Sequence, residues 1–121
     1  MKFNRFEEIE VWKNSRILVK DIYEITNNQF FSKDFGLKDQ IRRSAVSIPS
    51  NIAEGYERKS NIEFIRFLYI AKGSAGELRT QLYLAKDLNY LEDKLFNDLL
   101  TKCEEISKSL SGFIKYLQST I

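Results

Sequence analysis

Apolar residues along the chain recur at alternating spacings of four and three, which is the period of an amphipathic α-helix. The pattern predicts four helices, covering residues 6–28, 33–57, 60–87 and 92–119. Short polar stretches separate them, so consecutive helices are expected to pack against each other in opposite directions. The expected fold class is all-α, a single antiparallel up-down-up-down four-helix bundle formed by residues 1–121.

Each predicted helix has one apolar seam that is expected to face the core. In the first helix the seam is Val11, Ser15, Leu18, Ile22 and Ile25. In the second it is Leu37, Ile41, Ser44, Ile48, Ile52 and Ala53. In the third it is Phe64, Leu68, Ala71, Ala75, Leu78, Leu82 and Ala85. In the fourth it is Leu95, Leu99, Cys103, Ile106, Leu110, Phe113 and Leu117.

Helix ends and one proline give further detail. Ser32 is the expected N-cap of the second helix, with Asp34 in its first turn. Pro49 removes a backbone donor within the same helix, which predicts a kink there. Ser60 and Glu63 have the spacing of a capping box at the start of the third helix, where each side chain satisfies a free amide of the other.

Composition limits the chemistry. The chain has 19 basic and 17 acidic residues, one cysteine and no histidine. Without histidine, Ser–His and Cys–His nucleophilic pairs and the commonest zinc ligand are excluded. Carboxylate pairs such as Glu104 with Glu105 are expected to be solvated. We therefore expect no enzyme activity, metal, cofactor or small-molecule substrate. A single cysteine and no long apolar run favour a cytoplasmic protein without a membrane segment.

Small and polar residues concentrate in residues 37–55 and 71–82. Gly73 and Gly76 each cost a helix about 1 kcal/mol relative to alanine, so a close approach to the second helix is expected to offset this cost. The polar members of the cluster are Gln40, Arg43, Asn51, Glu54, Ser74, Glu77 and Gln81. They indicate a hydrogen-bonded network or part of a subunit interface. The alternative is a ligand or phosphate site centred on Arg42, Arg43 and Asn51.

The same segments resemble a known family. Residues 40–45 (QIRRSA) and 47–55 (SIPSNIAEG), together with Val11-Trp12, residues 71–74 (AKGS) and Glu77-Leu78, resemble the 23S rRNA intervening-sequence protein family along nearly the whole chain. That family takes its name from members encoded within insertions in bacterial large-subunit rRNA genes. The family is similar to the accessory proteins of diversity-generating retroelements, which are basic pentamers that bind nucleic acid. The resemblance implies a bacterial four-helix bundle that forms a homopentamer and has no catalytic residues.

One functional hypothesis is an oligomer that binds RNA or DNA. Lys72, Arg79 and Lys86 recur every seven residues, and Lys59 and Arg66 are expected close to the same line. Arg42 and Arg43 are further candidates, and Lys13, Arg16 and Lys20 form a comparable stripe on the first helix. A ring would multiply such stripes, and affinity for phosphates grows with the number of contacts.

The other hypothesis is a protein-interaction scaffold with no nucleic-acid partner. The first half of the third helix is apolar on nearly all sides, which indicates burial on more than one side. A subunit interface is therefore expected to involve Trp12, Ile65, Phe67 and Tyr69. Binding of RNA or DNA that depends on salt would separate the two hypotheses.

Overall fold

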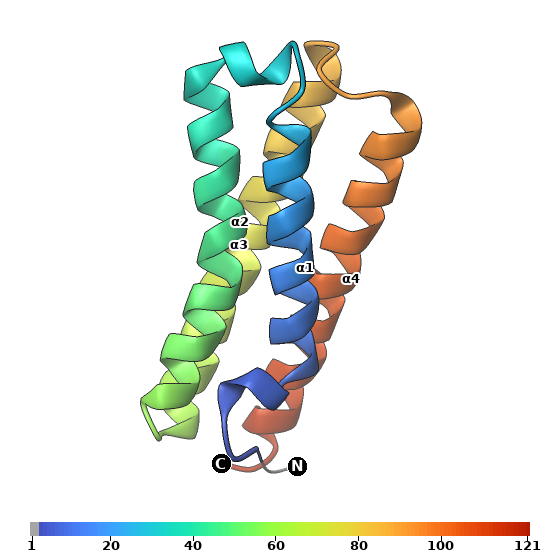
Figure 1. The fold of residues 1–121 in the computed structure, drawn as a ribbon. Helices are drawn as coiled ribbons and strands as arrows, with labels where there is room; N and C mark the ends of the chain where they lie inside the picture. Colours follow the sequence, from blue (N-terminus) through green and yellow to red (C-terminus); the bar gives the residue numbers. More distant parts are fainter. Residues whose placement is uncertain (1–2) are drawn as a thin grey trace.

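The computed structural model describes residues 3–121, in which four α-helices and two short 3-10 helices occur and no strand is present. The elements are η1 (Phe6–Glu8), α1 (Glu10–Ile25), η2 (Phe31–Lys33), α2 (Phe35–Glu57), α3 (Asn61–Asp87) and α4 (Asp93–Gln118). Successive helices run in opposite directions, and both chain ends lie at the same end of the bundle (Figure 1). The predicted all-α fold with four helices is confirmed. No helix in the described residues has the length and apolar character needed to cross a membrane.

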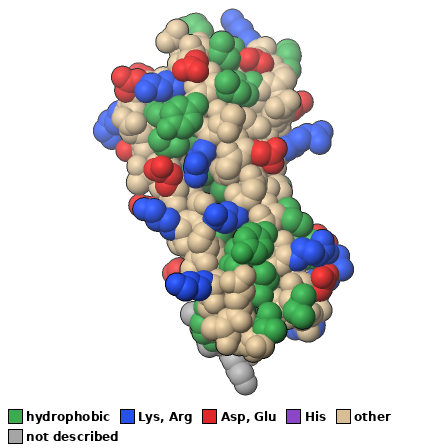
Figure 2. Space-filling model, turned by 180° about the vertical axis from the view of Figure 1, so that it is seen from behind, with side chains coloured by type: hydrophobic (Ala, Val, Ile, Leu, Met, Phe, Trp, Pro, Cys, Tyr) green, Lys and Arg blue, Asp and Glu red, His purple; other side chains and the backbone are tan. Residues whose placement is uncertain are grey.

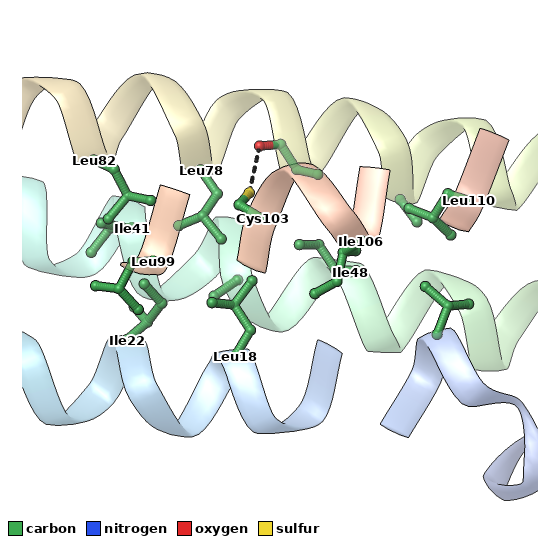
Figure 3. Close-up of a cluster of buried hydrophobic side chains, with 14 of the residues drawn as sticks. Leu18, Ile22, Ile41, Ile48, Leu78, Leu82, Leu99, Cys103, Ile106 and Leu110 are labelled. Atoms are coloured by element: carbon green, nitrogen blue, oxygen red, sulfur yellow. Dashed lines mark hydrogen bonds between the residues drawn. The ribbon is translucent and has the colours of Figure 1, made fainter. Parts of the chain in front are cut away.

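The core lies between the four helices and contains side chains from each of them. Leu18 and Ile22 of α1 meet Ile41 of α2 and residues of α3 and α4 in this layer (Figure 3). The predicted seams of α1 and α3 are buried at every position. Complete burial of so many aliphatic side chains supplies the main force for folding, at roughly 25 cal/mol per Å² of apolar surface removed from water.

The predicted seam of α4 is correct from Leu99 to Leu110 and again at Leu117, and it differs from the structure at Leu95 and Phe113. Phe96 and Ile114 are buried, whereas Leu95 is 39% exposed and Phe113 packs at the edge of the core. Two apolar residues are adjacent at each end of this helix, so spacing alone left two choices. The helix is rotated such that the larger Phe96 side chain and the β-branched Ile114 enter the core.

The start of α2 also differs from the prediction. Asp34 is the N-cap, because its carboxylate accepts a hydrogen bond from the Leu37 amide at 3.1 Å. Ser32, the expected cap, lies in the preceding 3-10 turn. At α3 one half of the predicted capping box is confirmed: Ser60 Oγ accepts from the Glu63 amide at 3.3 Å. The Glu63 carboxylate pairs with Arg66.

Helix α2 continues through Pro49 as a single α-helix. A bend of its axis at that residue stays a prediction.

The glycines expected to allow close packing of two helices point elsewhere. A Cβ added to Gly73 or Gly76 would have no neighbour within 4 Å. Close approach occurs instead at Gly55 of α2, where a Cβ would lie 2.6 Å from the Phe67 Cβ. The α2–α3 contact therefore depends on Gly55, and the two glycines of α3 lie on its outer side.

Candidate functional site

The polar cluster lies along one line, which we call the α2–α3 seam, where these two helices meet. At its centre, Asn51 Nδ2 donates to Ser47 Oγ at 2.9 Å and to the Ser47 carbonyl at 2.8 Å. Ser74 Oγ donates to the same Ser47 Oγ at 2.9 Å. Three polar positions thus form a hydrogen-bonded chain that links the two helices. Such a chain fixes their register.

A hollow of about 340 Å³ opens on this seam beside Ser47. Residues of both helices line it: Gln40, Arg43, Ser44, Ser47, Glu77 and Gln81. Gln81 is only 8% exposed, and its Oε1 has no hydrogen-bond partner within residues 3–121. The structure therefore brings Gln40, Arg43, Glu77 and Gln81 together, four of the residues that the sequence predicted for a polar cluster.

At the other end of the seam the charged side chains pair with each other. Arg58 lies 3.0 Å from the Glu54 carboxylate and 3.9 Å from that of Glu63. Arg66 is 3.2 Å from Glu63. The hydrogen bond from Arg66 lowers the pKa of Glu63 below its ordinary value, and the same contact raises the pKa of Arg66. Arg66 is therefore already paired within its own protomer.

Two of the three residues expected at a phosphate site, Arg42 and Arg43, line one hollow of about 490 Å³ together with Tyr23, and Asn51 is not among its lining residues. Arg42 Nε donates to Thr26 Oγ1 at 2.8 Å and Nη2 donates to Asn27 Oδ1 at 3.0 Å, which ties α2 to the end of α1. Its guanidinium also stacks over the Tyr23 ring, 4.3 Å from the centroid. Arg43 is exposed and also lines the hollow on the α2–α3 seam. The Asn51 side chain donates its hydrogen bond to Ser47.

Lys72, Arg79 and Lys86 form one line on α3, which we call the basic line. All three side chains are half-buried, and within the described part of the chain none forms an ion pair with an acidic group. Lys86 Nζ lies 4.6 Å from the centroid of the Phe96 ring of α4.

Two residues expected on this line are placed elsewhere. Lys59 lies between α2 and α3 with a φ of 58°. Ile65, not Arg66, occupies the position seven residues before Lys72. Because each residue of a helix turns it by about 100°, Arg66 lies on a different side.

In the comparable basic stripe on α1, two side chains have partners within the protomer. Lys13 lies 3.9 Å from the Glu10 carboxylate, and Arg16 is placed over the Trp12 ring at 5.7 Å. Trp12 itself is half-buried and packs edge-to-face against Phe6, with ring centroids 5.2 Å apart. Both observations favour a role for these side chains within the protomer.

The outer side of α3 carries exposed apolar residues with glycines between them, and we call it the outer face of α3. Ile62, Tyr69, Gly76 and Tyr83 recur every seven residues along it. Ile62 is 66% exposed, Tyr69 53% and Tyr83 50%, and Ile70 and Leu84 are exposed next to them. Figure 2 shows this side of the molecule, with apolar side chains above and below and basic ones between them.

The four residues expected at a subunit interface have different environments. Phe67 is 6% exposed and packs against Gly55 inside its own protomer, where Arg58 and Arg66 cover its ring. Trp12 and Ile65 are half-buried against the core. Tyr69 alone of the four is openly exposed. Periodicity missed this distinction because the seam of α3 includes Phe67, Ser74 and Gln81, which widens its buried side toward α2.

Reactive groups in the described residues are placed for structural roles. Cys103 is buried, its Sγ donates to the Ala75 carbonyl at 3.3 Å (Figure 3), and burial raises its pKa to about 12. The thiol therefore stays neutral near pH 7. Asp34 caps α2 and accepts from the Tyr90 hydroxyl at 2.9 Å. Within residues 3–121, no group of three acidic or cysteine side chains converges as metal ligands.

Comparison with known proteins agrees with this architecture. A family model described as 23S rRNA-intervening sequence protein matches residues 7–112. A crystal structure of a protein of unknown function from the S23 ribosomal protein family of Bacteroides thetaiotaomicron is similar, with a TM-score of 0.80 and 30% sequence identity over 87% of this chain and 98% of that one. No curated protein matches the chain significantly. The chain belongs to the 23S rRNA-intervening sequence protein family.

Proposed function

We propose that this protein is a non-enzymatic helical module that assembles into a homo-oligomer through the outer face of α3. The observation that carries the proposal is the line of Ile62, Tyr69 and Tyr83 with Gly76 between them. Large apolar side chains left in water along one line of a helix are typical of a surface that a partner covers. On the other helices the exposed apolar residues are more scattered.

The two glycines support the same surface. Gly73 and Gly76 each cost α3 about 1 kcal/mol relative to alanine. No atom of the described chain lies close enough to benefit from the missing Cβ atoms. A neighbouring backbone that approaches this face closely would account for both residues. The resemblance to pentameric accessory proteins favours a second copy of this chain as that neighbour.

Charge placed at the centre of this face tests the assembly. In Tyr69→Lys, a buried contact would acquire an unpaired ammonium group, so the variant should give species of lower molar mass than the wild type by light scattering. Ile17→Lys is the matched control, since Ile17 is 55% exposed on α1 and undergoes the same kind of change. An unchanged mass for Tyr69→Lys would remove the outer face of α3 from the interface.

A second candidate function, binding of RNA or DNA by the oligomer, has support from the basic line. Lys72, Arg79 and Lys86 are the basic side chains of α3 without an acidic partner in residues 3–121. An assembled oligomer would repeat this line once in each copy, and each added phosphate contact strengthens binding at low salt. If no nucleic acid binds, the protein-interaction scaffold is the remaining function for the same assembly.

A further inference from the structure

The hollow on the α2–α3 seam has features that the bundle itself does not explain. Arg43 on α2 and Glu77 on α3 both line it, and neither forms an ion pair with any residue in 3–121. Two opposite charges that flank one hollow without contacting each other leave room between them for a group that carries both charges. A volume of about 340 Å³ falls at the lower end of the range for small-molecule sites.

Polar groups in the hollow lack partners on both the donor and the acceptor side. Gln81 Oε1 is buried without a donor in residues 3–121. The Ser44 side chain also lines the hollow. Ser47 Oγ already accepts from Asn51 and from Ser74, so its own proton is left to donate. Buried polar groups in proteins are nearly always paired, so the unpaired Gln81 Oε1 needs an explanation.

We propose that this hollow binds a small zwitterion of the free α-amino-acid type. The ammonium group of the ligand lies on the α3 side, where the Glu77 carboxylate and Gln81 Oε1 accept its protons. The terminal torsion of a glutamine amide is soft, so Gln81 can turn its oxygen toward the ligand. The carboxylate of the ligand lies on the α2 side, where Arg43 and the Ser47 hydroxyl donate. Charge-assisted hydrogen bonds of this kind are the strong ones.

This site is independent of the assembly proposed above. It lies between α2 and α3 of one protomer, and no member of it belongs to the line of Ile62, Tyr69 and Tyr83. Failure of one proposal therefore leaves the other in place.

Calorimetric titration of the full-length protein with the common L-amino acids, one at a time, tests the site. We expect saturable binding of at least one of them. The amine that lacks its carboxylate and the N-acetyl derivative that lacks its ammonium group should each bind at least about tenfold more weakly. Absence of binding by every amino acid, or equal binding of inorganic phosphate, would overturn the proposal.

Two variants and a control locate the binding. Arg43→Gln and Glu77→Gln should each weaken the best amino acid at least about tenfold, since each removes one charged partner. Both side chains are exposed, so the helix content by circular dichroism should not change. Arg79→Gln, a basic residue of α3 outside the hollow, should leave the affinity as it was. Equal weakening in Arg79→Gln, or unchanged affinity in the two variants, would mean that the ligand binds elsewhere and would overturn the proposal.

Discussion

At the scale of single residues, glycine shows how the same residue type can serve opposite purposes in one bundle. Gly55 is buried and in contact with Phe67, whereas Gly73 and Gly76 have open space where a Cβ would be. The sequence predicted that glycine allows close packing of α2 and α3, but it assigned this role to Gly73 and Gly76 and not to Gly55. Gly55 lies near a helix end, where glycine is common, so its packing role had no signal in the pattern.

Gly55→Ala should destabilise the protomer by about 1–3 kcal/mol, because the new methyl would overlap with Phe67 Cβ and Phe64 Cδ1. The higher helix propensity of alanine is too small to offset this overlap. Gly112→Ala is the matched control, because a Cβ there has open space on α4 outside the proposed interface, and it should stabilise the protein by up to about 1 kcal/mol. Urea unfolding followed by circular dichroism measures both. A Gly55→Ala protein as stable as the wild type would contradict the close contact.

At the scale of elements, periodicity predicted what lies in the middle of each helix better than what lies at its ends. The seams of α1 and α3 were predictable because each repeats at strictly alternating spacings of four and three along the helix. At the ends of α4, neighbouring apolar pairs left two choices, and at the start of α2 two capping residues competed. Asp34 prevails over Ser32 because Tyr90, far along the chain, donates to its second carboxylate oxygen. No local pattern contains that contact.

Asp34→Ala should therefore weaken the protein more than removal of a cap alone. A missing N-cap costs about 0.5–2 kcal/mol, and Ser60→Ala, which removes only a cap at α3, measures this baseline. Asp34→Ala also frees the Tyr90 hydroxyl, whose pKa is raised chiefly by its hydrogen bond to Asp34. Spectrophotometric titration should then show the pKa of Tyr90 falling toward its ordinary value. Equal stability of the two variants with an unshifted Tyr90 would contradict the dual role of Asp34.

At the scale of the whole molecule, the sequence predicted the four-helix fold. Which side chains are exposed and unpaired on its surface became clear only from the structure. Polar residues spread over two helices were predicted to cluster, and they lie along one seam. The basic line was predicted at Lys72, Arg79 and Lys86, but Arg66 proved to be paired with Glu63 on another side. Glu63 lies three residues before Arg66 on the same helix, so spacing along that helix could have indicated this pair.

Binding of nucleic acid by the assembly can be tested on this line. Changing Lys72, Arg79 and Lys86 together to glutamine should weaken binding to all sequences alike. It should also flatten the log–log salt dependence by roughly one unit for each phosphate that the variant no longer neutralises. The control changes Lys94, Lys108 and Lys115 of α4 to glutamine, which lowers the net charge equally. Equal weakening in both triple variants would show an effect of net charge, not of this line.

The assembly proposal requires that other copies of the chain cover the outer face of α3. Light scattering coupled to size-exclusion chromatography, on wild-type protein at tens of micromolar, tests it most directly. We predict one species with a molar mass that is a multiple of the 14.2 kDa protomer, with five copies expected from the family resemblance. A single species at the mass of one protomer would contradict it.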